Sequence, residues 1–136
     1  MKNTAQLEHA DVLAILAAAT SEAQAHQWAV SIAVCDAGGH LLGLHRLDGA
    51  SPMSARMCAA KARTAAVARK ETRLLEEMIN QGRTAFLSAP ELDGLLEGGV
   101  PVIVGGQVIG AVGVSGVKSV EDAQVARAGI AAVVAA

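Results

Sequence analysis

The feature that most constrains the fold is a pair of short apolar runs joined by a glycine-rich turn. Residues 30–36 are mostly apolar and rich in β-branched side chains, residues 41–47 form a second run, and the turn between them reads Ala-Gly-Gly-His. Glycine supplies the positive φ angles that tight hairpin turns need. The block therefore predicts two antiparallel strands, the second of which carries Arg46 to its exit, just before Asp48.

A helix start follows this hairpin directly. Ser51 is a favourable N-cap residue, and Pro52 stands at the first helical position, where its fixed φ suits a helix. We expect an alanine-rich helix to about residue 69, with Lys61 in its middle. Charged groups at the hairpin exit and on this helix are thus predicted to share one site.

The remaining segments complete one domain over residues 1–136. Apolar residues at three- and four-residue steps predict a helix over residues 4–26, capped by Asn3. Two hairpins, rather than alternating strands and helices, indicate an α/β (α+β) fold with a mainly antiparallel sheet covered by helices. The other expected elements are a helix capped by Thr72 to residue 80, a short strand near residues 92–96, hairpin strands at 100–104 and 108–114, and a C-terminal helix capped by Ser119.

Composition restricts both the core and the classes of partner. Hydrophobic residues make up 52% of the chain, but it has one Phe, one Trp and no Tyr, so small aliphatic side chains fill the core. Such side chains favour close helix–sheet packing, and we expect other subunits to cover part of the surface. A net charge of −2 without a basic block argues against nucleic-acid binding.

Other features of the chain bear on its compartment. No apolar stretch reaches transmembrane length, so no membrane partner is expected. Glu8 and Asp11 interrupt the N-terminal segment, which does not resemble a signal peptide. Cys35 and Cys58 are lone thiols without metal or redox spacing and suit burial in a reducing cytosol, so we predict a cytoplasmic protein.

Three charged residues are the main candidates for chemistry. Lys61 is either a solvated lysine or a cation at a pocket rim that holds a carboxylate or a propionate, or that moves a proton. Arg46 and Asp48 form either a structural salt bridge or a clamp in which Arg46 binds an anion and Asp48 orients it. The residues alone leave these alternatives open.

Backbone amides and one histidine extend the candidate site. Gly98 and Gly99 allow their amides to approach an anion or oxyanion, and residues 113–116 followed by Ser119 form a second anion nest at a helix start. No pair of histidines has metal-ligand spacing. A single histidine can still be an axial ligand of haem iron, and His26, at the end of the first predicted helix, is the first choice; a solvent-exposed helix-end histidine is the alternative.

An ordered set of motifs over about residues 29–130 closely resembles the GlcG/HbpS-like family, which includes haem-degrading proteins and the C-terminal domain of PduO-type proteins. The motifs are Val-Cys-Asp-Ala-Gly-Gly-His-Leu, Arg-Leu-Asp-Gly-Ala, Lys-Ala-Arg-Thr-Ala, Thr72, Gly-Gly-Val-Pro and Gly-Ala-Val-Gly-Val-Ser-Gly, followed by Asp122. The resemblance implies a profilin-like fold with a five-stranded antiparallel sheet flanked by helices. It also implies assembly into dimers and often octamers, and haem or iron binding in some relatives. Among the positions that match the shared pattern are Arg46, Asp48, Lys61, Thr64, Gly98 and Gly99.

Three functions follow as hypotheses. The first is a small oligomeric binding protein for haem or a related tetrapyrrole, with Lys61 and Arg46 on the propionates. The second is a cofactor-independent isomerase, tautomerase, hydratase or dehydratase for a small carboxylate or a keto or hydroxy metabolite. Arg46 would hold the carboxylate, the Gly98 and Gly99 amides would stabilise an oxyanion, and Lys61, Asp48 or a histidine would move a proton. The third is a structural accessory subunit.

Overall fold

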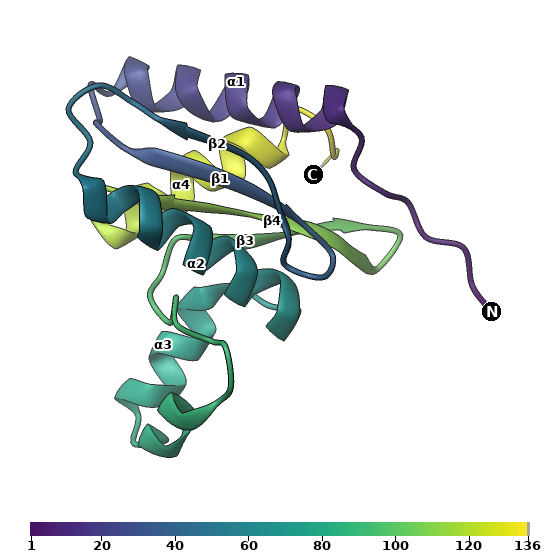
Figure 1. Cartoon of the computed structure of the whole chain (residues 1–136), viewed down its shortest axis with the longest axis vertical. Coiled ribbons are helices and arrows are strands. Elements are labelled where there is room, and N and C mark those ends of the chain that lie inside the picture. Colours follow the sequence, from purple (N-terminus) through teal and green to yellow (C-terminus); the bar gives the residue numbers. More distant parts are fainter. Residues whose placement is uncertain (136) are drawn as a thin grey trace.

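The computed structural model describes residues 1–135 and shows a four-stranded antiparallel sheet with helices on both faces (Figure 1). The strand order is β2-β1-β4-β3, and both predicted hairpins are present. The elements in chain order are α1 (His9–Ala25), β1 (Ser31–Asp36), β2 (Leu41–Arg46), α2 (Pro52–Ala68), α3 (Thr72–Asn80), the 3-10 helix η1 (Thr84–Ser88), β3 (Gly99–Val104), β4 (Gln107–Ser115) and α4 (Ser119–Ile130).

The expectation of five strands is wrong, because the described residues form four. The short strand predicted near residues 92–96 is instead irregular backbone that packs on α2. A side chain at Gly94 would overlap the backbone of Ala60 and Lys61, so this segment lies against a helix and not along a strand. The antiparallel α+β architecture itself is confirmed.

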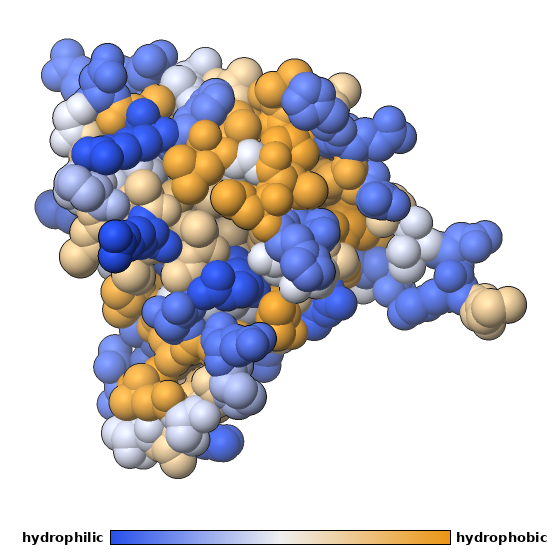
Figure 2. Space-filling model, viewed as in Figure 1, coloured by the Kyte–Doolittle hydropathy of each residue, from blue (hydrophilic) through white to orange (hydrophobic). Residues whose placement is uncertain are grey.

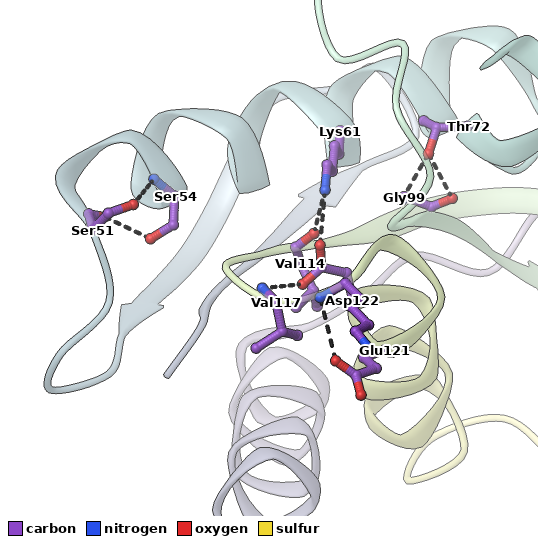
Figure 3. Close-up of polar contacts among 10 residues, drawn as sticks. Ser51, Ser54, Lys61, Thr72, Gly99, Val114, Val117, Glu121 and Asp122 are labelled. Carbon is purple, nitrogen blue, oxygen red and sulfur yellow. Dashed lines mark hydrogen bonds and ion pairs between the residues drawn. The ribbon is translucent and has the colours of Figure 1, made fainter. Parts of the chain in front are cut away.

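Of the four predicted helix caps, Ser51 is confirmed and the other three are wrong, although two of those three stand at the first helical residue. Ser51 caps α2 as predicted, with its hydroxyl oxygen accepting from the Ser54 amide at 3.1 Å (Figure 3). The first helix begins at His9 rather than near Thr4, because Glu8 is its N-cap residue. Thr72 and Ser119 are first helical residues and not caps, because Glu71 and Lys118 hold the N-cap positions.

The two faces of the sheet pack against different helices. α2 covers one face, while α1 and α4 cover the other (Figure 1). Successive side chains of β1 point to opposite faces of the sheet. Ile32 and Val34 accordingly belong to the larger core with α1 and α4. Ala33 and Cys35 belong to a second, alanine-rich core with α2. A Cβ at Gly113 of β4 would overlap the Cys58 carbonyl oxygen, which confirms the predicted close helix–sheet approach.

The surface retains exposed apolar side chains beside β2, an edge strand. Leu41 and Leu42 of β2 and Val67 of α2 are 55%, 41% and 50% exposed. Figure 2 shows apolar atoms gathered near the middle of the face on which Figure 1 places β2 and α2. Within residues 1–135, no helix is both long and apolar enough to cross a membrane.

Candidate functional site

Lys61 is buried and ion-paired inside the protein. From the middle of α2, its Nζ donates to the Val114 carbonyl at 2.9 Å and to Asp122 Oδ2 at 3.2 Å. The side chains of Lys61 and Asp122 are 4% and 3% exposed. Figure 3 shows Lys61 extending from α2 past the end of β4 toward α4. The pair therefore joins the two helical layers around one end of the sheet.

The carboxylate of Asp122 is held from two sides. Its Oδ1 accepts from the Val117 amide at 3.2 Å, while Oδ2 meets Lys61. Burial raises the pKa of Asp122, and the neighbouring Lys61 charge opposes that rise. The sequence places Asp122 after the last glycine-rich motif and near a predicted helix start. It did not identify Asp122 as the partner of Lys61, because the two residues are 61 positions apart and meet only across the fold.

The glycine pair lies beside Lys61, and the Gly98 carbonyl and the Gly99 amide both bond within the protein. Gly98 has a φ of +134°, and a Cβ there would lie 2.8 Å from Lys61 Nζ, so glycine makes room for the lysine. The Gly98 carbonyl accepts from Val114 at 3.0 Å. The Gly99 amide, predicted to face a ligand, donates to Thr72 Oγ1 at 2.9 Å (Figure 3).

Thr64 is also engaged internally. It lies one helical turn from Lys61 and is fully buried. Its hydroxyl accepts the Gly94 amide at 3.2 Å, which attaches the irregular segment before β3 to α2. In the described structure, Lys61, Thr64, Gly98 and Gly99 therefore form a buried polar brace around one end of the sheet.

Beside the second predicted anion nest, two backbone amides bind the chain's own carboxylates. At the start of α4, the Val117 amide donates to Asp122, and the Lys118 amide donates to Glu121 Oε1 at 3.3 Å. Side chains of α4 thus accept from the two amides that precede the helix (Figure 3).

Arg46 and Asp48 belong to a different place, an open cleft at the exit of β2. The cleft measures about 410 Å³, and Lys61 is not part of its wall. Arg46 Nε donates to the Ala50 carbonyl at 3.0 Å, and no ion pair joins Arg46 to Asp48 among residues 1–135. The cleft is lined by Gln24, Gln27, Trp28, Ala29, Arg46, Leu47 and Asp48. The single shared site expected from the sequence is therefore two sites, a surface cleft and a buried brace.

His26 adjoins this cleft through the only tryptophan of the chain. Its ring stacks on Trp28, with centroids 4.3 Å apart and planes 16° from parallel. The His26 side chain is 45% exposed, with Nε2 3.7 Å from Glu22 and 3.4 Å from Gln124. No group of three or more potential metal ligands occurs among residues 1–135. The sequence singled out His26 but gave no sign of Gln24 and Gln27, because glutamines near a helix end carry no distinctive pattern.

Comparison with known proteins places this geometry in a family. Residues 7–131 match the family described as haem degrading protein HbpS-like. The chain is 56% identical over 115 residues to Protein GlcG of Escherichia coli strain K12, which covers 85% of each protein.

Solved structures show the same fold. A double mutant of HbpS from Streptomyces reticuli superposes with a TM-score of 0.88 at 31% identity, covering 98% of this chain and 90% of that one. A PduOC:heme complex superposes with a TM-score of 0.86 at 27% identity, covering 95% of this chain and 96% of that one.

Proposed function

The chain belongs to the HbpS-like family, and from this premise we propose that it binds haem or a related tetrapyrrole at the cleft beside Trp28. The coarser assignment, a ligand-binding protein, rests on the family and on its haem-complex neighbour. The observation that carries the finer proposal is the cleft itself, because it combines an aromatic face, an arginine and an adjacent histidine.

The residues of the cleft fit the chemistry of such a ligand. Its volume of about 410 Å³ falls within the usual range for ligand pockets, about 300–1,000 Å³. The terminal guanidinium nitrogens of Arg46 have no partner among residues 1–135 and suit a propionate. His26 offers a ring nitrogen of the kind that ligates haem iron. Bound haem supplies an iron whose reactivity its axial ligand and surroundings tune.

The remaining predicted site residues take different parts in this proposal. Asp48 lines the cleft beside Arg46 and would orient the ligand. Lys61, Thr64, Gly98 and Gly99 hold the end of the sheet without touching the ligand. The alternative, a cofactor-independent isomerase or hydratase, draws no support from these contacts, because Lys61 and the Gly99 amide bond within the protein.

Assembly is part of the same proposal. We infer that copies of the chain associate into dimers or octamers, and the exposed Leu41, Leu42 and Val67 support this inference. Light scattering at micromolar concentration tests it, and a monomer would contradict it.

Titration with haemin, followed by the Soret band, tests the haem proposal. The wild-type protein is expected to give a saturable Soret shift. His26→Ala should weaken binding at least about tenfold, since even removing a hydrogen-bond partner of a metal ligand typically costs that much. His9→Ala is the matched control, because His9 is an exposed histidine at the opposite end of the same helix. A wild-type protein without a saturable shift would refute the proposal.

A further inference from the structure

Gln27 stands in a backbone conformation that glycine normally occupies. α1 ends with two hydrogen bonds, from the Gln27 amide to the Gln24 carbonyl at 3.1 Å and from the Trp28 amide to the Ala23 carbonyl at 2.8 Å. This pairing is the Schellman motif, in which the residue after the C-cap is left-handed and usually glycine. Gln27 fills that position with a φ of +59°. A side chain there opposes folding, because its Cβ crowds the neighbouring carbonyl.

A second helix of the chain shows what can offset such a penalty. Arg69 ends α2 with a φ of +60° and the same two-bond pattern. Its guanidinium donates to the Ala37 carbonyl at 3.0 Å and to the Val108 carbonyl at 3.2 Å, so the side chain ties the helix end to the sheet. The Gln27 side chain makes no hydrogen bond within residues 1–135, so no contact of the Arg69 kind offsets the cost of its backbone conformation. The side chain lines the cleft instead.

The lining of the cleft indicates what Gln27 would bind. Gln24 and Gln27 each offer a primary amide, which donates two hydrogen bonds and accepts others. Arg46 adds a cation, and Trp28, whose indole stacks on His26 on one side, adds aromatic surface. Amide donors beside a guanidinium suit a carboxylate, and the indole face suits the planar body that carries it.

We propose that Gln27 is a ligand-binding residue, whose side-chain amide donates to the carboxylate of a planar conjugated acid lying on Trp28. The inference deepens the proposed function, since haem is one such acid, but it also holds for smaller planar carboxylates. The backbone strain at the end of α1 is retained because glycine, the relaxed residue, cannot supply the amide.

Two variants at this position separate binding from folding. Gln27→Ala removes the amide and keeps the left-handed strain, whereas Gln27→Gly removes both. Both are expected to weaken binding of naphthoate about 2- to 10-fold, the effect of one hydrogen bond. Only Gln27→Gly should also raise the melting temperature, by about 2–5 °C, because relief of the left-handed strain outweighs the entropy that glycine adds to the unfolded chain. Arg69→Gly is the matched control, because it changes the same backbone position of another helix and should leave naphthoate affinity unchanged.

The binding readout is NMR titration with naphthoate as the probe. The chain has one tryptophan, so a single indole N–H resonance reports contact with the cleft, and the Gln27 side-chain amide resonance is assigned by its loss in Gln27→Ala. Both resonances are expected to shift saturably. Shifts with naphthoate but no Soret change with haemin would refute the haem proposal and support this one. A Gln27 amide that naphthoate leaves unmoved, or equal affinity in wild type and both variants, would overturn it.

Discussion

Replacing Lys61 by methionine tests whether the buried ion pair is a brace of the fold. Methionine keeps the length and apolar stem of lysine but removes the ammonium group. Asp122 then stays buried with only the Val117 amide as a partner, and the Val114 carbonyl loses a donor. Removing one partner of a buried pair costs about 3–5 kcal/mol, because the other charge is left uncompensated. This loss is a large fraction of the total free energy of unfolding of a typical protein, about 5–15 kcal/mol.

The loss of folding stability in Lys61→Met is expected to depend on pH. Burial already holds the pKa of folded Asp122 above its ordinary 3.8, and removing the Lys61 charge raises it further. A carboxyl group with a raised folded pKa binds its proton more tightly in the folded state. Stability is therefore greatest below the unfolded pKa and falls as pH rises through the folded pKa. The variant should lose most stability near pH 7.5 and recover part of it as Asp122 is protonated at lower pH.

Urea denaturation at pH 7.5 and pH 5 measures this effect. Lys61→Met with Asp122→Asn should recover much of the lost stability, because the amide carries no charge and its oxygen still accepts from Val117. Arg73→Met is the control for a solvent-exposed ion pair, since Arg73 and Glu77 are both exposed. The unfolding midpoint of this variant should be close to that of the wild type. The reasoning is refuted if Lys61→Met is as stable as wild type at pH 7.5, or if the second substitution recovers nothing.

Two further predictions concern close packing. Gly98→Ala should destabilise the fold by about 2–4 kcal/mol in urea denaturation, because in a left-handed backbone its Cβ would lie 2.6 Å from the Val114 carbonyl oxygen and 2.8 Å from Lys61 Nζ. Gly82→Ala, with a φ of +112° but nothing within 4 Å, should cost less, and equal losses would contradict the steric argument. Burial raises the pKa of both Cys35 and Cys58 to about 12. Neither thiol should therefore react with iodoacetamide at pH 8 until urea unfolds the protein. Rapid labelling of the folded protein would contradict this, because it would show that the thiols are accessible.

Short-range patterns in the sequence carried most of the architecture. The glycine turns at residues 37–40 and 105–107 predicted both hairpins, and Ser51 with Pro52 located the start of α2, because turn and cap preferences act within a few residues. The abundance of small residues predicted the close contact of α2 with the sheet. The strand expected near residues 92–96 failed because packing against α2 outweighed a weak local preference there.

The site depended on contacts between distant parts of the chain. Arg46 and Lys61 are near in sequence, yet one lines a surface cleft and the other is paired with Asp122 across the end of the sheet. The left-handed Gln27 also escaped prediction, because glutamine carries no preference for that conformation and only the helix end imposes it. Local preferences along the chain were enough to locate the two hairpins and the start of α2, because turns and caps involve neighbouring residues. The partners of the charged side chains emerge only when the chain folds, because burial and pairing depend on residues far apart in the sequence.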